Sequence, residues 1–460
     1  MNRLAKGKGT ASWLMRLIGL PAAAYAYAAG KWHSLSASHH MAEGALPLVL
    51  EPKAAAQLAA EWKVIALQHK GLGQGGSEYK LEAAMPLGSW TDSGMTAYGA
   101  EGLTPAELTL VRRIRSETEA LNRNNVTRTE AYRAIYGRLP ELHWALLAHL
   151  VSRNGGWNMT DLQGELLPRL LGEEKREAVF RFLERANMLI FQDAYPQLLL
   201  YEASLRERRG LFHLLPSLGI SRFMRPVWEQ FWERRDPVPL TVALIVNEQH
   251  YIEGRVVRHP FYQQRVLHTM FFGMQSMLQL NAVVFPYHLS GELRLAGLVL
   301  ENFENLQERI EFGKRLYAML FGVAEVREGA LRFVRRVRHS GSRRDYAPHL
   351  FAAVREAAPQ KLYQERLSGR GLAPGAAPLY SPELGAAWQD QPLEAAEPGD
   401  WFPPERPITP YFRKLPLPRS FEMTNEYSFL LNKIELAVLA AQQLPGSSAG
   451  EQASHPTQRP

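Results

Sequence analysis

The residues of this chain that are best suited to chemistry are gathered in the segment Ser152-Arg-Asn-Gly-Gly-Trp-Asn-Met-Thr-Asp161. An arginine such as Arg153 can hold a carboxylate or a phosphate through two parallel hydrogen bonds. The carboxylate of Asp161 can act as a base or bind a metal, and the adjacent glycines let a ligand approach the backbone closely. We therefore predict a site for a small anionic ligand here. Its binding residues are Arg153, Asn154, Trp157 and Asn158.

The same segment also has a purely structural interpretation. Asn154 and the two glycines would end one helix, because glycine adopts left-handed backbone angles without a Cβ clash. Thr160 or Asp161 would then cap the next helix, and Trp157 would fill the core. The segment lacks the lysine and hydroxyl residue that complete a phosphate-binding loop, so both interpretations stay open.

A second set of polar residues is predicted along one face of a helix from Leu240 to Val257. Asn247, His250 and Glu253 are spaced three residues apart, so they share that face. A histidine and a glutamate at this spacing can chelate a metal or act as an acid–base pair. If the face meets the glycine-containing segment, His250, Glu253 and Asp161 form one catalytic group. The alternative is an internal hydrogen-bond network, and the sequence identifies no particular metal or cofactor.

A run of arginines between Arg327 and Arg344 is a candidate contact with an anionic partner. Arg332 and Arg336 are four residues apart and Arg335 and Arg338 are three apart, so one helical face can carry them. Such a face can contact the phosphates of a nucleic acid or the headgroups of an anionic membrane. The net charge of +7 agrees with such a partner. A solvated charged face in an arginine-rich protein is the alternative.

The elements that must position these residues are mainly helical. Ala282 to Tyr287 and Leu293 to Leu300 fit either short strands or buried helical segments, and no strand–helix alternation or fixed repeat is present. We predict an all-α protein with at most one or two short strands, built as a multi-helix globular domain with irregular N- and C-terminal extensions. Helices are expected at residues 54–69, 104–121, 127–136, 140–151, 173–191, 197–208, 240–257, 261–280, 303–321 and 423–442.

The helix starts rest on two sequence signals. Thr104-Pro-Ala-Glu107 and Thr127-Arg-Thr-Glu130 both have the pattern of a capping box.

The chain is divided into an N-terminal extension that is partly loop, a helical core domain, a Pro/Gly/Ala-rich linker or cover segment, a C-terminal helix and a disordered tail. These regions span residues 1–102, 103–345, 346–422, 423–445 and 446–460.

The apolar stretch at residues 13–30 bears on localisation. Its uninterrupted part, Leu17 to Ala29, is shorter than the about 20 residues that a transmembrane helix needs. It fits a signal peptide, an interfacial anchor or an ordinary helix. We predict a cytoplasmic protein, with membrane association through this stretch or export as alternatives.

Residues Trp144-Ala-Leu-Leu-Ala-His-Leu-Val-Ser-Arg-Asn-Gly-Gly-Trp-Asn-Met-Thr-Asp-Leu162 resemble a block of the YppC-like family, a domain of unknown function in Bacillus-type bacteria. Asn247-Glu-Gln-His-Tyr-Ile-Glu253 resembles a second block. The resemblance covers residues 100–345 and implies no activity, because the family has none established. The Ala- and Pro-rich C-terminal region looks longer than this family core requires.

The amino-acid content and the motifs exclude several classes of site. The chain has no cysteine, so it has no disulfide, thiolate nucleophile or iron–sulfur cluster. It also lacks the Walker, nucleophile-elbow and dinucleotide-binding motifs. We therefore predict a helical binding or structural protein with a polar site where Arg153–Asp161 meets His250 and Glu253. The alternatives are a metal-assisted or acid–base hydrolase at the same site, and a peripheral membrane or nucleic-acid binding protein that uses Arg332–Arg344.

Overall fold

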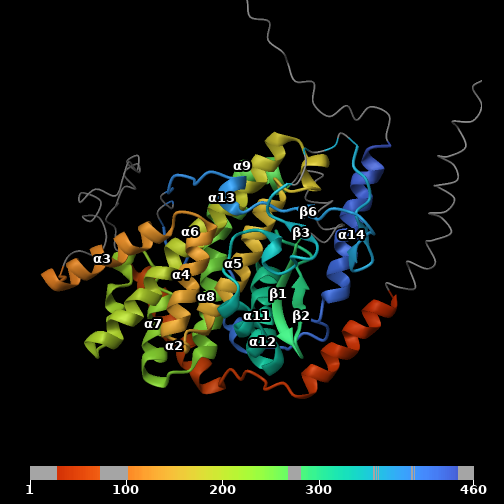
Figure 1. Ribbon diagram of the computed structural model, residues 1–460. Helices are drawn as coiled ribbons and strands as arrows, with labels where there is room; N and C mark the ends of the chain where they lie inside the picture. The colour runs from red at the N-terminus through yellow and green to blue at the C-terminus, as the bar shows by residue number, and fades with distance from the viewer. Residues whose placement is uncertain are drawn as a thin grey trace, which may run out of the picture.

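Helices make up most of the computed structural model and surround one β-hairpin (Figure 1). The structure describes residues 28–72, 102–267, 281–355, 358, 360, 362–394, 397 and 399–443. Four predictions therefore lie outside the described residues: the signal or anchor up to residue 27, the loops within 73–101, the end of the helix expected to reach residue 280, and the tail after 443.

The longer elements follow the predicted order, and the all-α class is confirmed. Residues 28–43 form the first described helix. The other helices are α2 Pro52–Leu72, α3 Pro105–Leu121, α4 Asn125–Arg138, α5 His143–Asp161, α6 Glu173–Glu207, α7 Met224–Arg234, α8 Pro237–Ile252, α9 Pro260–Tyr262, α11 Leu306–Gly322, α12 Ala324–Arg336, α13 Leu384–Ala387 and α14 Thr424–Ala441. A π-helical turn, Glu253–Val257, continues α8, and a second one, Gln263–Leu267, follows α9.

Helix α6 replaces two predicted helices with one. It continues for 35 residues through Pro196, where the prediction placed a break. A proline inside a helix removes one backbone hydrogen bond and usually kinks or ends the helix. Tyr195, Leu198 and Leu199 are buried on both sides of Pro196. Tertiary packing of this continuous apolar face therefore outweighs the local cost.

Helix α5 continues through the glycine pair that was expected to end it. A Cβ atom on Gly156 would lie 2.5 Å from His339 Nε2 and closer still to Asn125 Oδ1. The glycine thus allows two polar side chains to reach the helix backbone, and the prediction of a helix stop at this position is wrong. The helix ends five residues later, at Asp161.

The capping box predicted at Thr104–Glu107 is confirmed, and the one predicted at Thr127–Glu130 is wrong, because the helix starts three residues earlier. Thr104 accepts a hydrogen bond from the Glu107 amide at 3.3 Å, and the Glu107 carboxylate accepts one from the Thr104 amide at 2.9 Å, as predicted. Helix α4 is capped by Asn124, with Thr127 as its reciprocal partner. Thr127 is therefore inside the first turn, because Asn124 offers the better-placed side-chain acceptor.

The two apolar segments whose type was left open are strands. β1 Ala282–Leu289 and β2 Glu292–Val299 form an antiparallel hairpin, with Ala282 opposite Val299. Ser290 and Gly291 connect them with positive φ angles of 51° and 86°, as tight hairpin turns require. Helix α12 packs against β1. Residues 421–423 run along the outer edge of β2, where the Gly297 amide donates to the Phe421 carbonyl at 2.7 Å.

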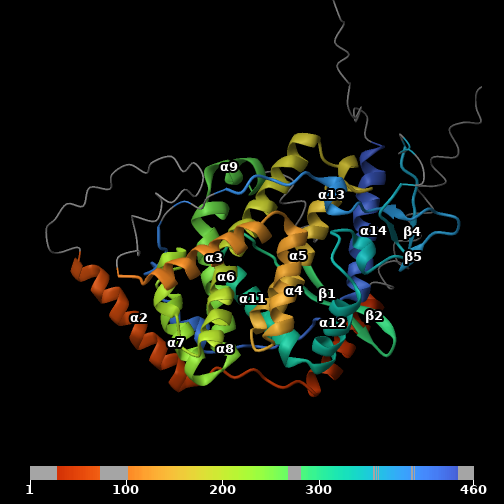
Figure 2. The same cartoon turned by 60° about the vertical axis from the view of Figure 1, so that its left-hand side comes forward.

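The region after residue 345 crosses the helical core as an extended cover (Figure 2). Before α14, its described residues form the short pairs β3 Phe351–Ala352 with β6 Leu379–Tyr380 and β4 Leu367–Ser368 with β5 Gly371–Leu372, the helix α13 and a 3-10 turn at Thr409–Phe412. Two tryptophans fix it to the core. Trp388 stacks on Phe180 with centroids 4.1 Å apart, and Trp401 stacks on His250 with centroids 4.2 Å apart.

Candidate functional site

Arg153, the residue that the sequence placed at the centre of an anion site, is fully buried on α5. Its Nε donates to His149 Nε2 at 3.1 Å, and one terminal nitrogen donates to the carbonyl oxygen of Val337. The other terminal nitrogen has no partner within the described residues. Burial lowers the pKa of Arg153 to about 10, which leaves the guanidinium charged at neutral pH.

His149 accepts the hydrogen bond from Arg153, and this fixes its own proton on the other ring nitrogen. His149 Nδ1 lies 2.8 Å from the carbonyl oxygen of Thr129 and therefore donates to it. Burial holds the pKa of His149 well below its usual value, so the imidazole is neutral. The pair Arg153–His149 thus connects α4, α5 and the end of α12 as a structural link.

Asn154 and Trp157 also make contacts within the protein. The Asn154 amide donates to Val284 O at 2.7 Å and accepts from Val284 N at 2.9 Å, which completes the free edge of β1. The Trp157 indole packs 4.5 Å from Tyr346, between ring centroids, and its Nε1 lies 3.5 Å from Asp345 Oδ2.

The end of α5 is joined to Arg343. Asp161 Oδ2 lies 2.6 Å from one terminal nitrogen of Arg343 and 2.7 Å from its Nε, and Asn158 Oδ1 lies 3.0 Å from the same terminal nitrogen. The second terminal nitrogen donates to Tyr346 and Tyr427, at 2.7 Å each. Asp161 is thus paired with an arginine in the folded chain.

Three residues that sequence reasoning missed complete this polar layer: Asn125, His339 and Asp345. Asn125 donates to the Ser152 carbonyl at 2.9 Å, so its oxygen faces His339 Nε2, also at 2.9 Å. His339 Nδ1 lies 3.4 Å from Asp345 Oδ2. His339 is separated from α5 by nearly two hundred residues, so sequence spacing carried no signal for this contact.

The polar face of α8 has different partners. Asn247 donates to Asp193 and accepts from Trp401 Nε1 at 2.9 Å. His250 stacks on Trp401 with an interplanar angle of 10°, and burial lowers its pKa to about 4. Glu253 lies beyond these two residues and pairs with Arg309 and Arg258.

The structure does not bring Asp161 together with His250 and Glu253. Trp144, near the start of α5, donates from Nε1 to Glu248 on α8 at 3.1 Å. Asp161 is at the other end of α5, about 25 Å along the axis at about 1.5 Å per residue. The predicted site residues therefore form two groups, which we call the α5 group and the α8 group.

The α8 group contains two acids that the sequence patterns did not single out. Asp193, on α6, is 2% exposed and accepts hydrogen bonds from Asn247 and Gln197, while its Oδ1 has no partner among the described residues. Burial raises the pKa of Asp193 to about 7 and that of Glu248 to about 8. An acidic residue within an apolar run of the sequence was the signal that could have identified Asp193.

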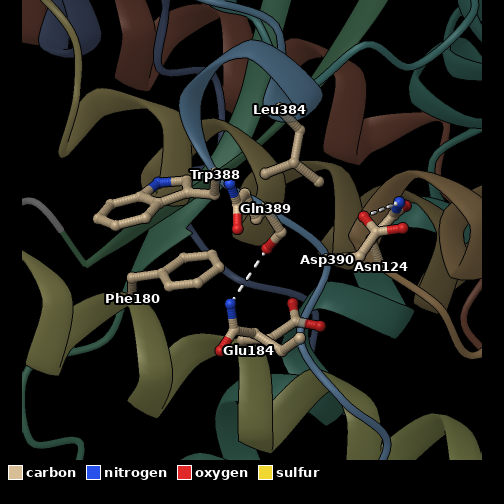
Figure 3. Close-up of a pocket in the computed structure, with 8 residues that line it drawn as sticks. Asn124, Phe180, Glu184, Leu384, Trp388, Gln389 and Asp390 are labelled. Atoms are coloured by element: carbon tan, nitrogen blue, oxygen red, sulfur yellow. Dashed lines mark hydrogen bonds between the residues drawn. The ribbon is translucent and has the colours of Figure 1, made fainter.

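Two hollows of the described residues lie apart from the named residues of both groups. The hollow in Figure 3 is lined by Phe180, Glu184, Trp388 and neighbouring polar residues and has a volume of about 10 Å³, room for a single water. A shallower groove of about 610 Å³ lies on the surface between Val257 and Glu304. Within the described residues, no three His, Asp or Glu side chains are close enough to hold a metal ion.

Comparison with known proteins gives a family. A family model described as "Protein of unknown function (DUF2515)" matches residues 120–428. The uncharacterized protein YppC of Bacillus subtilis (strain 168) is 42% identical over 236 residues, which are 51% of this chain and 72% of that protein. No solved structure is significantly similar. The match extends past residue 345, so the C-terminal cover, which looked longer than the family core requires, lies largely within the family match.

Proposed function

The chain belongs to the DUF2515 family of proteins of unknown function, and from this premise and the surface of the molecule we propose that it is a peripheral protein that binds anionic membrane surfaces on the cytoplasmic side. The helix at residues 28–43 carries this proposal, because it exposes a tryptophan and a leucine while it buries two serines. Ser34 and Ser38 face the protein and are fully buried, whereas Trp32 is 72% exposed and Leu35 38% exposed.

Two hydroxyl groups hold this helix to the core. The Ser34 hydroxyl lies 2.7 Å from a carboxylate oxygen of Glu426 and 3.0 Å from one of Glu422. Ser38 accepts from the backbone amides of Phe421 and Glu422, at 3.0 and 2.9 Å. A helix of a soluble domain normally buries its apolar side chains. Here Ser34 and Ser38 dock beside the buried Met41, and Trp32 and Leu35 are left exposed for another partner.

Exposed apolar side chains also occur in the next segment of the chain. Six of the twelve exposed large apolar side chains of the described residues lie between residues 32 and 67: Trp32, Leu35, Leu46, Val49, Val64 and Leu67. Exposed apolar side chains can mark interaction sites, and tryptophan favours the membrane–water interface. The apolar stretch at residues 13–30 leads directly into this helix, which supports an interfacial anchor.

The arginine run supplies the charge that this proposal needs. Arg335, Arg336, Arg338 and Arg344 are exposed, and none of them forms an ion pair with a described carboxylate. In Figures 1 and 2 the red helix of residues 28–43 and α12 both lie in the lower part of the molecule. The backbone links them, because the Leu46 amide donates to the Gly322 carbonyl between α11 and α12 at 2.8 Å.

Membrane binding by such a surface requires no membrane-spanning segment. No helix of the described residues is both long and apolar enough to cross a bilayer. Each basic residue near an anionic membrane contributes about 1 kcal/mol, and burial of a large apolar side chain contributes about 2 kcal/mol. Four arginines with Trp32 and Leu35 would thus give binding in the micromolar range.

The test is co-sedimentation of the full chain with lipid vesicles. We expect retention on vesicles with about a third phosphatidylglycerol, little retention on phosphatidylcholine alone, and release by about 0.5 M salt. The double variant Trp32→Ser/Leu35→Ser and the double variant Arg335→Gln/Arg336→Gln should each weaken retention by about tenfold or more.

Matched controls come from the same chain. Leu436→Ser changes an exposed leucine on α14, and Arg113→Gln/Arg206→Gln changes two exposed arginines on α3 and α6. Both controls should leave retention unchanged. Equal retention on neutral vesicles, or binding to duplex DNA with no binding to vesicles, would overturn the proposal.

A further inference from the structure

Trp401 occupies a slot whose walls are other aromatic rings. His250 stacks flat against the indole at 4.2 Å between centroids, and the ring of Phe223 lies 5.0 Å away. Asn247 Oδ1 accepts a hydrogen bond from the indole N–H at 2.9 Å. Because the Asn247 amide nitrogen is held by Asp193, the oxygen is fixed toward the slot. Such walls select a flat ring, and the oxygen selects an N–H on its edge.

Two buried polar atoms near the slot, Asp193 Oδ1 and His250 Nε2, have no hydrogen bond to any described residue. The lone pair of His250 Nε2 lies in the plane of a ring that stacks on the indole, so only Asp193 Oδ1 can bond the edge of a ring in the slot. Buried polar atoms are nearly always hydrogen-bonded, so each exception needs an explanation. An indole has one N–H and no acceptor, so it can satisfy only one neighbour. A ring with more polar atoms on its edge could satisfy more of them.

The segment that carries Trp401 is fastened at the surface. Arg222 pairs with Asp400 at 2.9 Å, and Arg255 donates to the Gly399 carbonyl at 2.8 Å. Exposed ion pairs of this kind add little stability. The Trp401 ring is itself half-buried, so it can leave the slot by side-chain rotation. Arg222 and Arg255 would remain nearby for an anionic substituent of an entering ring.

We infer that this slot binds a planar nitrogen heterocycle of the nucleobase type and that Trp401 fills it when that heterocycle is absent. Asn247 accepts a hydrogen bond from a ring N–H, His250 stacks on the face of the ring, and Phe223 contacts it at an angle of 55°. Asp193 Oδ1 bonds another polar atom on the edge of the ring. The ligand must displace the indole. Its apparent affinity is therefore its affinity for an empty slot multiplied by the fraction of molecules whose slot is empty. This inference stands independently of the membrane proposal.

The test compares the binding of guanosine, adenosine and indole by calorimetry and thermal shift. Trp401→Gly empties the slot, and we expect it to bind at least one purine nucleoside about tenfold more tightly than indole and more tightly than the wild type does. Adding Asn247→Ala should remove about tenfold of that affinity, because the ring N–H loses its acceptor. Trp401→Phe keeps the slot filled but leaves Asn247 unpaired, so purine binding should exceed that of the wild type.

Trp388→Gly is the matched control, since Trp388 also stacks on an aromatic ring but donates to the backbone carbonyl of Met159 at 2.8 Å. It should show no preference for purines over indole. Binding of indole as tightly as any purine by Trp401→Gly would mean that the slot is ordinary core packing. The same conclusion follows if Trp388→Gly shows the same preference, or if Trp401→Phe binds no nucleoside.

Discussion

The protonation of the Asp193 side chain is tied to folding. It is 2% exposed and its pKa is raised to about 7 by burial, against about 4 in an unfolded chain. Between these values the folded state holds a proton that the unfolded state has released. Stability therefore falls as the pH rises from about 4 to about 7, and the contribution of this group is constant above that range.

Asp193→Asn should remove this dependence. The amide keeps the shape and can still accept from Asn247 and Gln197. The free energy of unfolding of the wild type, measured in urea, should fall by about 3 kcal/mol more than that of the variant between pH 4 and pH 7. Glu229→Gln, at an exposed pair with Arg225, is the control and should follow the wild type. Parallel profiles for Asp193→Asn and the wild type would contradict the assignment.

Gly156 and Gly137 offer a second comparison between single residues. A methyl group on Gly156 would overlap His339 and Asn125, whereas one on Gly137 in α4 meets nothing within 4 Å. Gly156→Ala should therefore lower the free energy of unfolding by about 2 kcal/mol or more. Gly137→Ala should raise it by about 0.5 kcal/mol, since alanine favours a helix. Equal effects in urea denaturation would show that Gly156 is not a close-packing position.

The polar residues of α5 and α8 could be selected from the sequence, but their partners could not. Arg153, Asn154 and Asp161 were chosen for their chemistry, and all three are engaged in polar contacts. Their partners, for example Arg343, lie far away from them in the sequence. A period of three or four residues locates side chains on one helix and carries no information about which helix faces it.

At the scale of elements, local signals identified the helices better than their ends. The capping box at Thr104 is local chemistry and was confirmed. Pro196 and Gly156 are also local signals, but packing decides at both positions: α6 continues through one and α5 through the other. The hairpin was ambiguous because its residues are apolar on both faces, which fits a buried strand and a buried helix alike.

Asn154 connects two elements, and its removal should loosen one of them. Its amide pairs with both backbone groups of Val284 on β1. Asn154→Ala leaves a buried N–H and a buried carbonyl without a partner, so we expect a loss of about 2 kcal/mol and faster hydrogen exchange in β1. Asn432→Ala, on the exposed face of α14, should leave that exchange unchanged. Unaltered protection of Val284 in the first variant would show that Asn154 does not hold the strand.

For the whole molecule, charge and apolar surface are distributed unevenly. Half of the exposed large apolar side chains of the described chain lie between residues 32 and 67. The buried core is crossed by a polar layer around Arg343, which joins α5 to α14 through Asp161 and Tyr427. The arginine run thus has two parts: Arg343 holds the helical core and the C-terminal cover together, while its neighbours face solvent.

Adjacent arginines should therefore separate stability from membrane binding. Arg343→Met leaves the half-buried Asp161 unpaired, so it should cost about 3 kcal/mol of unfolding free energy and expose the C-terminal cover to limited proteolysis. Arg344→Met removes an exposed charge and should change stability by less than about 0.5 kcal/mol, while retention on anionic vesicles weakens by about fivefold, the equivalent of about 1 kcal/mol. The folded fraction of Arg343→Met should bind vesicles like the wild type. If Arg344→Met binds vesicles as the wild type does, Arg344 is not part of the binding surface. If Arg343→Met is as stable as the wild type, the Arg343–Asp161 pair does not hold the cover in place.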